Sequence, residues 1–211
     1  RSPNNYTEYA DTVQEIVDNV KNNGNQALFE YTKKFDKADI NEGNIKVTKE
    51  EIQEAYKEVD AHLLEVIRKA LVNIRTYHEK QKQYSWFDTT EEGTMLGQKV
   101  TALNSVGVYV PGGKAVYPSS VLMNIVPAKV AGVKNIIMTT PCNAEGKVYA
   151  TTLVAANEAG VDAIYKAGGA QAIAALAYGT ESVSKVDKIV GPGNIFVALA
   201  KRAVYGYVSI D

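Results

Sequence analysis

Three short apolar runs in the second half of the sequence end in glycine-containing turns, and each turn has a polar side chain beside it. Tyr109 comes before a Pro-Gly-Gly turn, Gln171 follows a Gly-Gly turn, and Asn194 closes a Gly-Pro-Gly turn. Glycine lets the backbone approach a ligand closely, and a helix that begins after such a turn offers N–H groups and a partial positive charge to a phosphate. These residues indicate a site for a ligand with phosphate or other polar groups.

Each of these features also has a purely structural explanation. Turns between strands and helices commonly contain glycine, Asn194 is a good helix cap, and a half-buried tyrosine such as Tyr109 is common in strands. The turns do not match the dinucleotide-binding fingerprint, because Phe196 stands where the third glycine is needed and no acidic ribose partner lies near Thr139-Thr140. From the residues alone, both explanations stay open.

Other residue types with reactive side chains are scarce. Cys142, His62 and His78 are the only cysteine and histidine residues, so this chain cannot build a zinc site of the usual Cys/His type by itself. Cys142 follows a proline that ends an apolar run, but neither histidine can be assigned as its base. His78 lies on the apolar face of a helical segment, where a structural role is expected. We predict no catalytic residue and no metal ligand in this chain.

From residue 101 onward, apolar runs alternate with helical patterns. Parallel strands with two buried faces read as continuous apolar runs, and repeated strand–turn–helix units form a parallel sheet through right-handed crossovers. We therefore predict an α/β fold with a parallel, Rossmann-like sheet and helices on both faces. Ligands bind such sheets beyond the carboxyl ends of the strands, where all of the Pro/Gly turns lie. The expected strands are Val106–Val110, Asn135–Met138, Ala163–Lys166, Lys188–Val190 and Tyr207–Ile210, and the expected helices are Ser119–Ala131, Val148–Ala159, Gln171–Ala177 and Ile195–Val204.

The first hundred residues differ in character from the rest. Residues 1–100 contain 32 charged residues and 4 glycines, whereas residues 101–211 contain 15 and 12. We predict a mainly helical N-terminal region with a short strand at 1–100, and a Rossmann-like domain at 101–211. The elements expected in the first region are a helix ending at Gly24, a short helix capped by Asn25, a strand at 44–47, a capping box at Thr48–Glu51 and a long helix after Asp60.

The overall composition is typical of a soluble globular protein, with 45% hydrophobic and 22% charged residues. A net charge of −1 gives no support for binding to nucleic acid or to a membrane surface. No apolar run reaches the length of a membrane span, and the first residues lack the basic and apolar regions of a signal peptide. Because a single cysteine excludes an intrachain disulfide, we expect a cytoplasmic protein.

Long strings in the sequence resemble those of the histidinol dehydrogenase family. The second half contains VGVYVPGGKAVYPSSVLMNIVPAKVAGV and GGAQAIAALAYGTESVSKVDKIVGPGN, and the first half contains ALFEYTKKFD, Tyr77-His78-Glu-Lys-Gln81 and Leu96-Gly97-Gln98. The resemblance covers essentially the whole chain in order. Matches of this length at several places are far more specific than a short motif.

The resemblance implies an enzyme that oxidises L-histidinol through the aldehyde to L-histidine. Such an enzyme uses two NAD and a zinc ion, and it forms an intertwined homodimer. The NAD contacts implied by the resemblance fall on Tyr109, Gln171 and Asn194. These residues belong to three different strand ends, which the topology already brings to one edge of the sheet. We therefore expect residues 101–211 to form an NAD-binding domain.

The resemblance also implies that this chain is part of a longer enzyme. Family members continue beyond Ser209–Asp211 into a portion that carries the zinc ligands, a Glu-His pair and most substrate contacts. We therefore expect an NAD-binding portion that is inactive alone, with residues 1–100 belonging to a lobe completed by downstream sequence. The alternative is a non-catalytic ligand-binding or assembly module on the same α/β scaffold, because a fold does not determine a function.

Overall fold

The structure is a computed structural model that describes residues 7–112 and 116–211, and a five-stranded parallel sheet forms its centre. The strands of this sheet are β3 (Ser105–Tyr109), β4 (Asn135–Thr140), β5 (Ala163–Lys166), β6 (Lys188–Val190) and β7 (Ser209–Ile210). They lie in the order β5-β4-β3-β6-β7, and each neighbouring pair is parallel. The chain adds β4 and β5 on one side of β3 and then places β6 on the other. The order of the strands therefore switches direction between β3 and β6.

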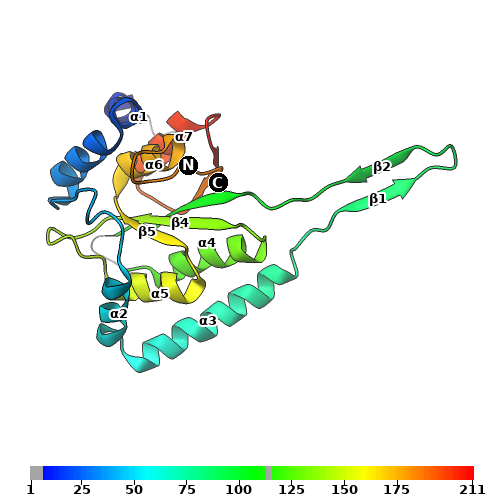
Figure 1. The fold of residues 1–211 in the computed structure, drawn as a ribbon, viewed down its shortest axis with the longest axis horizontal. Coiled ribbons are helices and arrows are strands. Elements are labelled where there is room, and N and C mark those ends of the chain that lie inside the picture. The colour runs from blue at the N-terminus through cyan, green and yellow to red at the C-terminus, as the bar shows by residue number, and fades with distance from the viewer. Residues whose placement is uncertain (1–6, 113–115) are drawn as a thin grey trace.

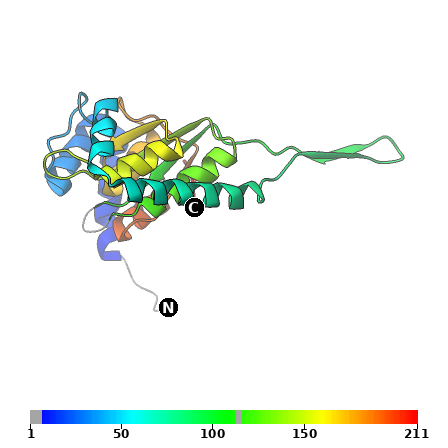
Figure 2. The same cartoon turned by 90° about the horizontal axis from the view of Figure 1, so that it is seen from below.

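Helices cover both faces of the sheet, which confirms the predicted α/β fold (Figures 1 and 2). Helices α6 and α7 pack together with α1 on one side, while α4 and α5 lie on the other, where they contact α3 and α5 also contacts α2. The first three helices therefore form an outer layer around the sheet domain. The helix bounds are α1 (Thr7–Asp36), α2 (Lys49–Glu58), α3 (Ala61–Glu79), α4 (Pro118–Val130), α5 (Ala150–Ala159), α6 (Gly169–Tyr178) and α7 (Ile195–Val204).

The N-terminal helices share one hydrophobic core with the sheet. Val17 and Leu28 of α1 and Ile67 of α3 are buried in the same cluster as Val108 at the centre of β3. The proposed division into two domains at residue 100 stays a prediction. What the described residues establish is that the first three helices pack directly on the helices that flank the sheet.

Helix α1 is broken at Gly24, as the sequence predicts. Gly24 has φ 52° and ψ −127°, which separates two helical halves. The carboxylate of Glu181 accepts a hydrogen bond from the backbone N–H of Asn25 at 2.7 Å, and the Asn25 side chain donates to Ser182 Oγ at 2.8 Å. Asn25 itself is buried. The break in α1 is therefore the point at which this helix is fastened to the loop after α6.

The segment expected to be a strand at 44–47 runs along the free edge of β5. The backbone N–H of Val47 donates to the carbonyl of Ile164 at 2.9 Å, and the N–H of Lys166 donates to the carbonyl of Ile45 at 2.8 Å. Lys46 and Tyr165 form an antiparallel bridge between the two segments. This pairing covers a sheet edge that would otherwise expose unpaired backbone groups.

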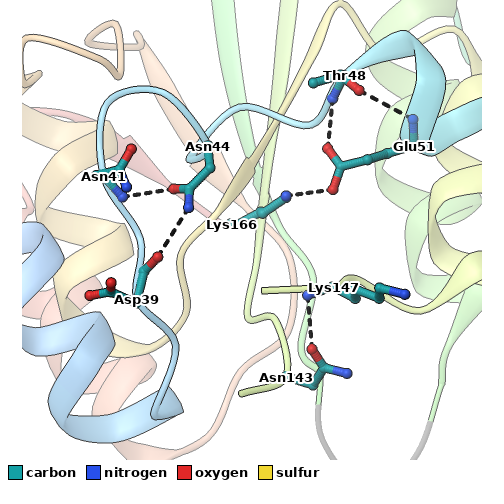
Figure 3. A network of polar contacts seen from close by, with 8 residues as sticks. All are labelled: Asp39, Asn41, Asn44, Thr48, Glu51, Asn143, Lys147 and Lys166. Carbon is teal, nitrogen blue, oxygen red and sulfur yellow. Dashed lines mark hydrogen bonds and ion pairs between the residues drawn. The ribbon is translucent and has the colours of Figure 1, made fainter. Parts of the chain in front are cut away.

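The capping box at the start of α2 is confirmed, and it also neutralises a buried lysine (Figure 3). Thr48 Oγ1 accepts from the N–H of Glu51 at 3.2 Å, and Glu51 Oε2 accepts from the N–H of Thr48 at 2.9 Å. The other oxygen of Glu51 pairs with Lys166 Nζ at 2.5 Å. Lys166 is the last residue of β5, and its charge is therefore paired with a carboxylate of α2.

A two-stranded arm projects from the body of the molecule between α3 and β3 (Figures 1 and 2). It consists of β1 (Trp86–Thr89) and β2 (Met95–Gln98), which pair antiparallel. All eight residues are exposed. No strand is expected here from the sequence, because a hairpin without a buried face has no alternation of apolar and polar residues to reveal it.

The remaining predicted elements are present with small shifts of their ends. Strand β4 continues to Thr140, helix α6 begins at Gly169, and the fifth strand is limited to Ser209–Ile210, which pairs with β6. Gly113 and Lys114 of the first glycine turn lie outside the described residues. Within the described ranges, none of the helices combines the length and the apolar character needed to cross a membrane.

Candidate functional site

A cavity of about 340 Å³ opens at the carboxyl ends of the central strands. Tyr109, Gln171 and Asn194 all line it, so the fold brings together the three residues selected from the sequence. The cavity lies beside the switch in strand order between β3 and β6, which is the usual ligand position in sheets of this kind. Its volume is in the range of small-molecule sites.

Tyr109 ends β3 and connects it to the start of α6. The residue is buried, and its hydroxyl accepts a hydrogen bond from the backbone N–H of Gly169 at 3.2 Å. Burial raises the pKa of the Tyr109 hydroxyl above its ordinary value, which outweighs the opposing effect of the hydrogen bond from Gly169. The hydroxyl is therefore neutral at physiological pH and can still donate its proton to a ligand.

Gln171 is a buried polar side chain without a partner. It is 1% exposed, and neither its Nε2 nor its Oε1 finds a hydrogen-bonding partner among the described residues. An unsatisfied buried donor or acceptor costs about 1–3 kcal/mol. Because the side chain lines the cavity, a ligand with its own donor and acceptor would remove this cost.

Asn194 caps helix α7, so the role as a helix cap that its sequence position indicates is confirmed. Its Oδ1 accepts from the N–H groups of Phe196 at 3.1 Å and Val197 at 3.2 Å. The amide nitrogen takes no part in this cap. Since Asn194 also lines the cavity, the same side chain can cap the helix and donate to a ligand.

The glycines of the turns allow the strand ends to pack closely. A Cβ atom on Gly112 or on Gly168 would lie 2.7 Å from the ring of Pro141, which follows β4. A Cβ atom on Gly169, where φ is +62°, would lie 2.7 Å from Oε1 of Gln171. The turns therefore require glycine for their own packing, and this packing forms the wall of the cavity.

The turn after β6 is held by a buried lysine. Lys201 Nζ donates to the carbonyl of Gly191 at 2.6 Å and forms an ion pair with Asp211. The other carboxylate oxygen of Asp211 accepts from the N–H of Gly191 at 2.8 Å. A second hollow of about 520 Å³ adjoins this turn, with Lys201 and Asp211 in its lining. The pair fixes the backbone that leads into Asn194.

Sequence reasoning missed Thr12, a polar residue of the cavity, and it also missed Asp36. It is the last residue of α1, it lines the cavity, and its buried Oδ2 has no hydrogen-bonding partner among the described residues. Burial raises the pKa of Asp36 from 3.8 to about 6. The signal available in the sequence was the string ALFEYTKKFD, which ends on this residue, but the string does not reveal where α1 packs.

Cys142 and His78, the other reactive residues considered from the sequence, do not line this cavity. Cys142 is buried, and burial, together with the charge of Asp36, raises its pKa to about 11, so it is a thiol and not a thiolate near neutral pH. His78 lies in the last turn of α3, where its Nδ1 contacts Gln81 Oε1 at 2.7 Å. Within the described ranges, no three side chains of His, Cys, Asp or Glu converge as metal ligands would.

The parallel sheet with a ligand-sized cavity at its switch point defines a Rossmann-like α/β protein. The chain belongs to the histidinol dehydrogenase family, since the model of this family, described as histidinol dehydrogenase, matches residues 1–211. The recognition of the family from the sequence is thereby confirmed.

Named relatives agree with this assignment. The chain is 61% identical to the histidinol dehydrogenase of Bacillus subtilis over 95% of its own length and 46% of the relative's length. It is 59% identical to that of Geobacillus kaustophilus over 94% and 46%. The crystal structure of histidinol dehydrogenase from Elizabethkingia anophelis superimposes with a TM-score of 0.94 at 39% identity, covering all of this chain and 48% of that one. The chain spans about half the length of the relatives it matches.

Proposed function

We propose that the chain is the NAD-binding portion of a histidinol dehydrogenase and that NAD binds in the cavity at the carboxyl ends of β3–β6. The observation that carries this proposal is the buried, unpartnered amide of Gln171 in a cavity shared with Tyr109 and Asn194. A protein rarely buries an amide without satisfying either of its polar atoms. A bound ligand that supplies the missing partners explains why this amide is tolerated.

The residues of the cavity can bind different parts of a dinucleotide. Gln171 offers a donor and an acceptor, Tyr109 offers a hydroxyl proton, and Asn194 offers its amide nitrogen. Helix α6 begins at the cavity without a side-chain cap, and its N-terminal N–H groups favour an anionic pyrophosphate. The bound cofactor supplies a hydride acceptor, and the role of these residues is to bind and orient it.

The substrate and the metal of the complete reaction are proposed from the family. We propose that the longer enzyme oxidises L-histidinol through the aldehyde to L-histidine. The zinc ion implied by the resemblance finds no cluster of ligands among the described residues, so no zinc site is assigned to them. We propose a cytoplasmic location, in keeping with a single cysteine, Cys142, which leaves no intrachain disulfide to form.

Titration calorimetry with NAD tests the central proposal. We expect the chain to bind NAD at one site, with a Kd in the micromolar to millimolar range that corresponds to about −4 to −8 kcal/mol. The folded state should be verified by circular dichroism in the same sample. An intact fold that takes up no NAD at millimolar concentration would contradict the proposal and favour the alternative of an assembly module.

We also propose a homodimer, in which the arm formed by β1 and β2 is covered by a second copy of the chain. One face of the arm carries Trp86 and Leu96, and the opposite face carries Phe87 and Met95, with exposed fractions of 54%, 60%, 65% and 68%. A two-stranded hairpin is marginally stable in water at best. An arm with large apolar side chains on both faces is expected to need a partner surface.

Sedimentation velocity should detect this dimer and its dependence on the arm. The double variant Phe87→Lys, Leu96→Lys places one lysine on each face, and we expect it to sediment as a monomer. The control Thr89→Lys, Gln98→Lys adds the same charge to the same two strands at polar positions, and it should remain a dimer. A wild-type chain that is monomeric at high micromolar concentration would refute the proposed dimer.

A further inference from the structure

An acidic side chain enters the cavity from a helix that does not belong to the sheet domain proper. Asp36 is the last residue of α1, which packs across α6 and α7. It lines the same cavity as Tyr109 and Gln171. Tyr109 ends β3 and Pro141 follows β4, so this shared lining puts Asp36 near the ends of both strands, in keeping with the contribution of its charge to the raised pKa of Tyr109 and Cys142.

The carboxyl group of Asp36 is not neutralised by the charged groups around it. Lys33 pairs with Asp39, Lys37 donates to the carbonyl of Lys34, and Lys34 lies over the ring of the neighbouring Phe35. These lysines of its own segment are thus occupied elsewhere.

The groups that face Asp36 from the sheet do not neutralise it either. Tyr109 and Cys142 face it from the ends of β3 and β4, and both are uncharged near neutral pH because their pKa values are raised. Lys166, which also acts on Cys142, is paired with Glu51. The buried Oδ2 of Asp36 therefore lacks both a donor and a cation among the described residues.

Asp36 lies where Rossmann-type sites have an acidic residue that the sheet of this protein lacks. In Rossmann-type sites, an acidic residue near the end of the second strand binds the ribose hydroxyls of NAD. The strand beside β3 is β4, which ends in Thr139-Thr140 and is followed by Pro141 without an acidic residue. Asp36 lines the cavity together with Pro141, so helix α1 supplies a carboxylate at the end of β4 that the sheet does not provide.

We propose that Asp36 accepts hydrogen bonds from ribose hydroxyls of the bound dinucleotide and thereby selects NAD over the same dinucleotide with a 2′-phosphate, NADP. The inference rests on the proposed NAD site. A carboxylate accepts hydrogen bonds from two neighbouring hydroxyl groups, whereas it repels a phosphate that carries up to two negative charges. Asp36 is thus a specificity-determining residue that comes from the N-terminal region.

Calorimetric titration of the 211-residue chain and of Asp36→Asn with NAD and NADP tests this role. For the wild type we expect clear preference for NAD. For Asp36→Asn we expect weaker NAD binding and stronger NADP binding, so that the ratio of the two Kd values falls at least about tenfold. Asp39→Asn is the matched control, because Asp39 has the same charge three residues away and its side chain is 87% exposed. The control should keep the wild-type ratio.

The stability of the ligand-free chain gives a second readout. Because the pKa of Asp36 is raised from 3.8 to about 6, the folded state holds the proton more tightly than the unfolded state. Wild-type stability therefore falls as the pH rises through this interval. Asparagine does not titrate, so the urea midpoint of Asp36→Asn should exceed that of the wild type at pH 8 and the difference should shrink at pH 4.

Two results would overturn the inference, and they differ from failure of the NAD proposal. If the wild type binds NAD but Asp36→Asn has the same preference between the two dinucleotides, Asp36 is not the selecting residue. If Asp36→Asn is less stable than the wild type at pH 8, Asp36 holds the fold together and is not reserved for a ligand. A wild-type chain that binds neither dinucleotide would refute the NAD site itself.

Discussion

The Gln171→Met variant is expected to be more stable than the wild-type chain and to bind NAD more weakly. Methionine has nearly the length of glutamine and replaces the unpartnered amide by apolar atoms, so removal of the unsatisfied groups should raise the free energy of unfolding by about 1–3 kcal/mol. Loss of the hydrogen bonds to the ligand should cost about 2–3 kcal/mol of binding, which is roughly a 30- to 140-fold rise in Kd. Urea unfolding and calorimetric titration measure the two effects.

Gln26→Met is the matched control for this variant. Gln26 lies on the exposed side of α1, where its amide donates to Glu30 at 3.1 Å. The same substitution there should leave NAD binding unchanged and alter stability by less than about 0.5 kcal/mol. A Gln171→Met chain that is less stable than the wild type would mean that the amide has a structural partner, and unchanged affinity would remove Gln171 from the site.

The Gly191→Ala variant is expected to be severely destabilised. Gly191 has φ +112°, and a Cβ atom would lie 2.1 Å from the carbonyl oxygen of Tyr109. Strain of the backbone and the forced displacement of β3 from this turn should together cost about 3–5 kcal/mol of the free energy of unfolding. Because the turn leads into Asn194, we also expect NAD binding to be lost or strongly weakened in the fraction that remains folded. Urea unfolding and NAD titration are the measurements.

Gly206→Ala is the control that distinguishes the effect of the close contact at Gly191 from the effect of a positive φ. Gly206 also has a positive φ, +98°, but a Cβ atom there meets nothing within 4 Å. This substitution should lower the free energy of unfolding by about 1–2 kcal/mol, because only the backbone conformation is unfavourable for alanine there. Equal destabilisation by the two alanines would show that the contact between Gly191 and Tyr109 contributes little.

The sheet and its turns could be predicted because their signals are local. Apolar runs such as Val106–Val110 and the glycine turns that end them consist of consecutive residues. In a parallel sheet the carboxyl ends of such strands lie at the same edge. This is why Tyr109, Gln171 and Asn194 could be grouped before the structure was known. The capping boundaries at Thr48 and Gly24 were predictable for the same reason.

Features that depend on packing between distant segments could not be predicted. Asp36 reads as the end of an amphipathic helix, and its place in the cavity follows from how α1 packs on α6 and α7. The arm at 86–98 has no buried face, so its sequence carries no periodic pattern. The absence of partners for Gln171 is likewise a property of the assembled fold, because sequence cannot reveal which amides remain unsatisfied.

The way α1 is fastened to the loop after α6 has a consequence for the order of folding. The hydrogen bond between Asn25 and Ser182 joins residues 157 positions apart. The hydrogen bond between Ser105 and Asp187, which lies beside the pairing of β3 with β6, spans 82 positions. Closing such long loops is slow compared with forming local strand–turn–helix units. The walls of the cavity come from both sides of these contacts, so the cavity is complete only after the most distant parts of the chain have met. Nascent chains that stop short of β6 therefore contain all of α1 but lack Asn194 and Phe196 of the cavity wall.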